Sequence, residues 1–163
     1  MTAGRTLKLM TYNLKFACPI FEPPWEIRRE MQDLMTEKVG IFRNEDKLKD
    51  AIEALRELKE RSEHITLSNQ SLTMNQELIQ RWELENLLAV SMVCAQGALN
   101  RRESRGGHFR EDFPDRKDEF NYHTLAYMTD FRNVILGKSP VDMSIYEAKG
   151  DNYEQFAVIE RKY

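Results

Sequence analysis

The residues best suited to chemistry lie in one charged stretch, residues 101–118. Through Lys117 this stretch carries six cations and four anions, an excess of two positive charges in a chain whose net charge is -3. The pair Gly106-Gly107 divides the stretch, and His108 follows directly. Because each buried ion needs a partner or costs several kcal/mol, we predict a surface or docking loop instead of a core segment.

His108 is the candidate for acid–base or metal chemistry, with Arg105, Glu111 and Asp112 close by in the sequence. A metal site needs three or four converging ligands, and only His108 is a strong ligand candidate in this loop. The two other histidines are interpreted as a helix-end residue and a strand residue. We therefore favour hydrogen bonding within the loop for His108 over catalysis or metal binding.

Gly106-Gly107 also raises the possibility of a phosphate-binding loop. No Gly-Lys-Ser/Thr follows the pair and no strand precedes it, so the P-loop and dinucleotide-binding fingerprints are both absent. A tight turn that lets another backbone approach closely is the better interpretation. Arg105, beside this turn, is expected to make a bidentate bond to a carboxylate or to backbone carbonyls, either across an interface or within the chain.

The order Arg-x-Glu-Ser-Arg-Gly-x-His-x-Arg-x-Asp, placed after a Leu-Glu-x-x-Leu-Leu helix, resembles the carboxy-terminal region of the succinate dehydrogenase and fumarate reductase flavoprotein subunits. The matching residues are Arg101, Glu103, Ser104, Arg105, Gly106, His108, Arg110 and Asp112. Val39–Arg43 resembles the family's helix junction, and His123–Tyr127 resembles its first tail strand. The resemblance covers residues 26–141.

The L-aspartate oxidases are similar to this sequence in the Glu-Ser-Arg-Gly-x-His core. They typically place an apolar residue before the aspartate, whereas this sequence has Arg110-Glu111-Asp112. The resemblance therefore favours the dehydrogenase and reductase branch. The carboxy-terminal domain of an L-aspartate oxidase and a stand-alone helical protein-interaction module are the alternatives.

The resemblance implies a mainly α fold, a three-helix up-and-down bundle like a spectrin repeat with a small C-terminal β hairpin tail. It implies that the chain supports an FAD-binding domain of the same flavoprotein and helps present it to an iron-sulfur subunit. FAD and catalysis then belong to the parent protein's upstream part, with no cofactor, metal or catalytic residue in this segment. The residues expected to dock are Arg101, Glu103, Ser104, Arg105, Gly106, Gly107, His108, Arg110 and Asp112.

Composition is consistent with one core, since 41% of the 163 residues are apolar. Balanced charge argues against a nucleic-acid partner. The two cysteines, Cys18 and Cys94, have no metal-type spacing, and we expect a reducing compartment with Cys94 buried in a central helix. Because no apolar run is long enough for a membrane span, we expect a cytoplasmic protein without direct membrane insertion, whose association with a membrane, if any, is through a parent complex.

We expect the chain to be divided into three parts: an extended N-terminal arm (1–23), a helical bundle with the charged loop (24–118) and a small β tail (119–163). The first helix is predicted from Trp25 to Val39, with a narrow apolar stripe that packs on one neighbour and Gly40 as its stop. Asn44 is predicted to cap the second helix. On that helix, two ion pairs four residues apart are expected, Lys49 with Glu53 and Glu57 with Arg61.

The third helix is predicted from Thr73 to about Arg102, with a capping box formed by Thr73 and Gln76, and it is apolar on most sides. Arg101 and Arg102 suit its negative end. Large apolar side chains on the helices are assigned to core packing. They are Trp25, Trp82, Met31, Met35, Met74 and Met92.

The tail is predicted as a hairpin, because Tyr122–Met128 alternates with period two and Val134–Leu136 follows. Gly137–Pro140 is interpreted as the punctuation that ends the second strand. Phe156–Ile159 is a candidate further strand.

Overall fold

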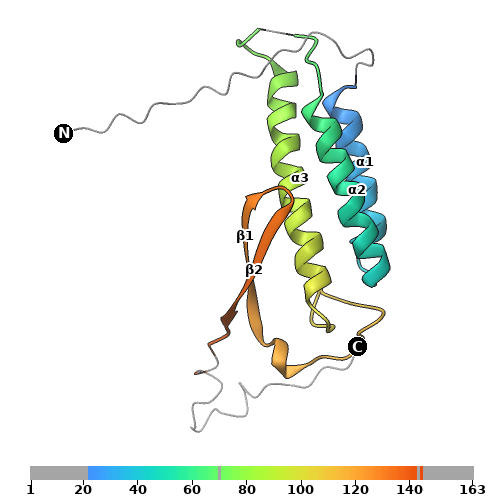
Figure 1. Ribbon diagram of the computed structural model, residues 1–163, viewed down its shortest axis with the longest axis vertical. Coiled ribbons are helices and arrows are strands. Elements are labelled where there is room, and N and C mark those ends of the chain that lie inside the picture. The colour runs from blue at the N-terminus through green and yellow to red at the C-terminus, as the bar shows by residue number, and fades with distance from the viewer. Residues whose placement is uncertain (1–21, 70, 143, 145–163) are drawn as a thin grey trace, which may run out of the picture.

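A computed structural model describes residues 22–69, 71–142 and 144. The three long helices are α1 (Pro24–Lys38), α2 (Glu45–Glu63) and α3 (Gln76–Asn100). They run up and down side by side, as Figure 1 shows. A short 3-10 helix, η1 (Asp118–Phe120), precedes the antiparallel hairpin of β1 (Tyr122–Asp130) and β2 (Asn133–Pro140). The mainly α bundle with a β hairpin tail is therefore confirmed.

α1 begins with Pro24, whose fixed φ suits a first helical position. Its buried residues Ile27 and Met31 join the single core, and α1 contacts both α2 and α3. The expectation that its narrow stripe packs on one neighbour is wrong, because the stripe lies between the two other helices. The first helix also ends earlier than predicted, at Lys38, with Val39 as its C-cap.

α2 begins as predicted, since the Asn44 side chain accepts a hydrogen bond from the Lys47 amide at 3.0 Å. Its apolar stripe is buried against the two other helices. The buried apolar residues are Leu48, Ala51, Ile52, Leu55 and Leu58. The predicted ion pairs are replaced by others: Lys49 contacts Glu45, and Arg61 reaches Glu22 and Glu30.

The N-cap of α3 is Asn75 and not Thr73, because the Asn75 side chain accepts from the Leu78 amide at 3.0 Å. Met74, just before it, has a positive φ of 56° and is exposed, so it is not a core residue. Asn75 is favoured as the N-cap because its side-chain amide also donates hydrogen bonds to the Asn69 and Ser71 carbonyls. These two bonds fix the preceding loop. The predicted capping box is therefore wrong.

α3 is central, yet one of its faces is open to solvent. Leu84, Leu88 and Met92 are fully buried, but Trp82 is 46% exposed and Cys94 is exposed. Trp25 on α1 is likewise 53% exposed. Apolar periodicity identified α3 as buried, but it did not say which of its faces has no partner among the described residues.

The hairpin lies against the second half of α3 (Figure 1). Met128, Phe131 and Val134 pack on the helical core. Its strands pair from Tyr122 opposite Pro140 to Asp130 opposite Asn133. β2 therefore continues through the segment predicted to end it. An antiparallel edge strand accepts proline where no ladder donor is needed, and Pro140 is the last residue of β2.

Several expectations lie outside the described residues: most of the N-terminal arm (1–23) and the candidate strand Phe156–Ile159. No helix in residues 22–69, 71–142 and 144 is both long and apolar enough to cross a membrane.

Candidate functional site

The loop that follows α3 folds around two fully buried ions, Glu103 and Arg110. This corrects the prediction that the charged stretch holds no core segment. The prediction failed because charges on this one loop partner each other, so burial leaves neither ion unpaired. The loop is an ordered turn structure that buries three polar residues, Glu103, Ser104 and Arg110.

Glu103 is held by three neighbours. Its Oε1 accepts from Arg101 Nη1 at 2.5 Å and Arg105 Nε at 2.9 Å, and its Oε2 accepts from Arg105 Nη2 at 3.2 Å and the Lys117 amide at 2.9 Å. Burial by itself raises the pKa of this carboxyl, but the hydrogen bonds from Arg105, Lys117 and Arg101 outweigh it, and the net pKa is lowered. Glu103 is therefore an ionised, fully satisfied hub.

Arg105 makes the expected bidentate bond, and its carboxylate partner is Glu103 of the same chain. Its Nη2 also donates to the Lys117 carbonyl at 2.8 Å. Arg101 extends the cluster to the hairpin, because its Nη2 donates to the Tyr122 carbonyl at 2.6 Å and its guanidinium lies 4.8 Å from the Tyr122 ring. These two arginines tie the loop to the β tail.

Arg110 caps the end of α3. The last carbonyls of a helix have no partner within it, and Arg110 Nη1 donates to the Ala98 carbonyl at 3.0 Å and the Leu99 carbonyl at 3.2 Å. A buried cation there also complements the negative end of the helix dipole. The sequence suggested Arg101 and Arg102 for this position, but Arg101 pairs with Glu103 and Arg102 is exposed.

Asp112 joins Arg110 to the beginning of α2. Its two oxygens accept from Arg110 Nε and Nη2, and Oδ2 also accepts from the Glu45 backbone amide at 3.0 Å. The hydrogen bond from Arg110 is the largest cause of the lowered pKa of Asp112. One carboxylate therefore accepts hydrogen bonds both from the positive end of α2 and from the cation that caps α3.

Arg43, in the junction between α1 and α2, holds the other side of the loop. Its Nε donates to the Phe109 carbonyl at 3.1 Å and its Nη2 donates to the Gly107 carbonyl at 3.2 Å. The Glu111 amide donates back to the Arg43 carbonyl at 2.9 Å. Burial, together with the positive charge of Arg110, lowers the pKa of Arg43. The motif Val39–Arg43 is thus a structural partner of the charged loop.

Ser104 is buried under the turn. Its hydroxyl donates to the Phe113 carbonyl at 2.8 Å and accepts from the Arg110 amide at 2.9 Å. Its own amide donates to the Asp115 carbonyl at 3.1 Å. A hydroxyl is the smallest side chain that can both donate and accept here, which explains a serine between two charged residues.

The predicted tight turn at Gly106-Gly107 is present. Arg105 and His108 exchange two backbone hydrogen bonds across it, of 2.7 and 3.0 Å, and Gly106 has a φ of 58°. His108 Nε2 lies 3.3 Å from the Arg101 carbonyl. Burial and then the charge of Arg43 lower the pKa of His108 to about 4. The ring is neutral at pH 7, so Nε2 donates to that carbonyl and His108 serves the loop's internal bonding.

The outer surface of the loop carries an apolar rim that the sequence analysis did not single out. Ile41 is 69% exposed and Phe42 is 65% exposed, and the Phe42 ring meets the Phe109 ring edge-on at 6.3 Å. The exposed glycines of the turn complete this rim, which we define as Ile41, Phe42, Gly106 and Gly107. Two apolar residues directly after a helix-stopping glycine were the signal that could have revealed it.

The structure brings all nine predicted docking residues together in one cluster. Among the described residues, no group of histidine, cysteine and acidic side chains has the arrangement to hold a metal ion. Nearly every charged group in the cluster is committed to an internal bond. These internal bonds fix the shape of the loop, and the apolar rim lies on its outer surface.

The comparisons with known proteins agree with this arrangement. A family model described as "Fumarate reductase flavoprotein C-term" matches residues 28–163. The chain is 44% identical over 98 residues to the fumarate reductase flavoprotein subunit of Helicobacter pylori, covering 60% of this chain and 14% of that protein. It is 39% identical over 122 residues to the succinate dehydrogenase flavoprotein subunit of Coxiella burnetii, covering 75% and 20%.

Solved structures give the same result. A variant of the E. coli quinol fumarate reductase superimposes with a TM-score of 0.70 at 35% identity, over 74% of this chain and 21% of that chain. The adenylylsulfate reductase of Archaeoglobus fulgidus gives 0.67 at 25% identity, over 77% and 20%. This chain spans about a fifth of the length of most of these relatives. It belongs to the family of carboxy-terminal domains of fumarate reductase and succinate dehydrogenase flavoproteins.

Proposed function

We propose that this chain is the helical carboxy-terminal domain of a succinate dehydrogenase or fumarate reductase type flavoprotein, where it supports the FAD-binding domain. The observation that carries the proposal is the family motif at residues 101–112, folded into a rigid loop with an apolar rim. Internal bonds from Arg43, Glu103 and Arg110 prepare the loop before any partner is met. Preorganisation of this kind lowers the entropy cost of docking.

The described residues do not fit FAD. Dinucleotide sites use a strand, a glycine-rich turn and a helix N-terminus, whereas Gly106-Gly107 follows a helix and the described sheet is an antiparallel hairpin. We propose that FAD and the C4-dicarboxylate substrate belong to the upstream part of the flavoprotein. The whole enzyme would pass a hydride and a proton between flavin and dicarboxylate, and exchange electrons with quinone.

The proposed docking role combines the predicted docking residues with the apolar rim. The polar side chains of the cluster shape the loop, and the rim of Ile41, Phe42, Gly106 and Gly107 makes the contact. The residues that act in docking under this proposal are Arg101, Glu103, Ser104, Arg105, Gly106, Gly107, His108, Arg110 and Asp112. The proposed partners are the FAD-binding domain and, through it, an iron-sulfur subunit.

The experiment expresses the FAD-binding region of the flavoprotein and this chain as two polypeptides and measures their association. Phe42→Asp should weaken association at least tenfold, because it places a charge in the apolar rim. Ile135→Asp is the matched control, since Ile135 is also an exposed apolar residue, 51% exposed, but lies on the hairpin. Equal affinity for wild type and Phe42→Asp would refute the docking role.

The stand-alone interaction module predicts a different gene structure. If this chain is a domain of a flavoprotein, a flavin-binding coding sequence lies immediately upstream in the same reading frame. An independent gene with its own start site and no such neighbour would favour the stand-alone module.

A further inference from the structure

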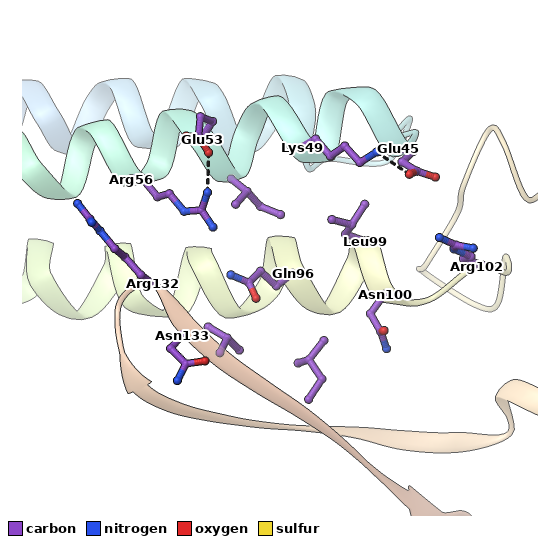
Figure 2. A pocket seen from close by; sticks show the side chains of 13 residues that line it. Glu45, Lys49, Glu53, Arg56, Gln96, Leu99, Asn100, Arg102, Arg132 and Asn133 are labelled. Carbon is purple, nitrogen blue, oxygen red and sulfur yellow. Dashed lines mark hydrogen bonds and ion pairs between the residues drawn. The ribbon is translucent and has the colours of Figure 1, made fainter.

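A groove of about 670 Å³ runs between α2, the second half of α3 and the hairpin. It is separate from the apolar rim. Figure 2 shows Arg132, from the hairpin turn, at one end and Arg102, from the charged loop, at the other. The groove is therefore bounded by two cations contributed by different parts of the fold.

The charges in the groove do not cancel. Lys49 pairs with Glu45 at 2.7 Å and Arg56 pairs with Glu53 at 2.6 Å, so the two acids that line the groove are neutralised. Arg102 and Arg132 are exposed, and neither forms an ion pair with another of the described residues, although the Arg102 guanidinium lies 6.0 Å from the Phe113 ring. The lining thus carries an excess of two positive charges, although the whole chain has a net charge of -3.

The floor of the groove is apolar and its sides offer amides. Ile52 from α2, Leu99 from α3 and two hairpin side chains, Val134 and Leu136, contribute the apolar surface. Gln96, Asn100 and Asn133 also line the groove. Such amides both donate and accept hydrogen bonds, as a peptide backbone requires.

We propose that this groove binds an extended acidic segment of a partner protein, with apolar side chains on the floor and carboxylates at Arg102 and Arg132. Charge complementarity selects an acidic occupant, because the lining has two guanidinium groups left over. Guanidinium binds carboxylate in a bidentate manner. The apolar floor selects a peptide with alternating acidic and apolar residues over a purely charged one.

The test measures binding of dye-labelled octapeptides to the 163-residue chain by fluorescence anisotropy. A peptide of alternating glutamate and leucine should bind. Peptides of alternating lysine and leucine, and of alternating glutamate and serine, should bind at least tenfold more weakly. Binding of the first peptide should weaken as salt is raised, since both arginines are exposed. Equal binding of all three peptides, or no binding of the first, would overturn the proposal.

Substitutions of the two groove arginines test whether the peptide binds in the groove. Arg102→Glu combined with Arg132→Glu should weaken binding of the glutamate-leucine peptide at least tenfold, and Arg29→Glu, an exposed arginine on α1, should change it less than twofold. Amide NMR shifts should concentrate at Ile52, Val134 and Leu136 when the peptide is added. Unchanged binding by the folded double variant would overturn the proposal. So would self-association of the wild-type chain that the double variant abolishes, because the occupant would then be a second copy.

Discussion

Arg110 and Asp112 form a bidentate ion pair, with Nε to Oδ1 at 2.7 Å and Nη2 to Oδ2 at 2.6 Å. The pair connects two helix ends, because Arg110 also caps the last carbonyls of α3 and Asp112 also accepts from the first amide of α2. It is the point where the charged loop, the helix junction and the bundle are joined. Its role is tested by replacing Arg110.

Arg110→Met should lower the free energy of unfolding by roughly 3 kcal/mol, because it removes a buried cation and leaves the α3 carbonyls and Asp112 without their donor. Urea unfolding followed by circular dichroism measures the change. Arg116→Met is the matched control, since among the described residues Arg116 forms an ion pair with the exposed Asp118 alone, at 3.9 Å, and it should cost under about 1 kcal/mol. Similar losses in both variants would contradict the capping role.

His108 should make stability depend on pH between about 6.5 and about 4. Its folded pKa is about 4, below the unfolded value near 6.5, so the unfolded state binds a proton first as pH falls. Stability from this residue is fully present above pH 6.5 and declines until pH reaches about 4. His108→Gln should remove this part of the pH dependence of the free energy of unfolding. An NMR titration of the wild-type ring should give the low pKa directly.

Glu103 should make the stability of the chain depend on pH in a more acidic range than His108 does. Its pKa is lowered in the folded state, so its contribution is present above the unfolded value of about 4.3 and is lost as pH falls through the folded pKa. Glu103→Gln should destabilise the chain at pH 7 and reduce the further loss of stability below pH 4. A variant with the same acid unfolding curve as wild type would show that Glu103 is not the buried ionised hub.

Gly106→Ala should destabilise the chain by roughly 1 kcal/mol, because a Cβ is strained at a φ of 58° even where space is open. Gly107→Ala is the control, since its added Cβ also meets nothing within 4 Å and its φ lies outside the left-handed region. Thermal unfolding of both variants separates backbone strain from steric crowding. A larger loss for Gly107→Ala would contradict the turn geometry.

The sequence predicted the elements better than it predicted exposure. Periodicity of apolar residues located α1, α2 and α3 because burial on one face leaves a pattern with the period of the helix. It could not show that Trp82 faces solvent, since α3 is apolar on most sides and the pattern does not say which side is covered. Asn75 was missed as N-cap because Thr73 also satisfied the capping-box spacing, and only contacts with the preceding loop decide between them.

The sequence predicted which residues form the site, but it did not predict how their side chains contact one another. The family motif contains eight of the nine predicted docking residues, and the fold brings all nine together. Charge density suggested exposure, because the sequence does not reveal that Glu103 and Arg110 form ion pairs with charged side chains two residues away. Nor does it reveal that more distant backbone groups complete their hydrogen bonds. The same limit applies to Arg43, which is 64 residues from its partner Gly107 and 66 residues from its partner Phe109.

Arg105 provides the test that separates loop shape from docking. Its bidentate bond to the fully buried Glu103 means that Arg105→Ala removes two of the donors that hold this carboxylate. Leaving a buried carboxylate under-satisfied costs roughly 1–3 kcal/mol, so the isolated chain should lose several degrees of thermal stability. Arg105→Lys restores the charge but not the planar fork, and it should recover only part of that loss. If instead Arg105→Ala leaves the melting temperature unchanged and weakens association with the FAD-binding region, Arg105 contacts the partner directly and does not act by shaping the loop.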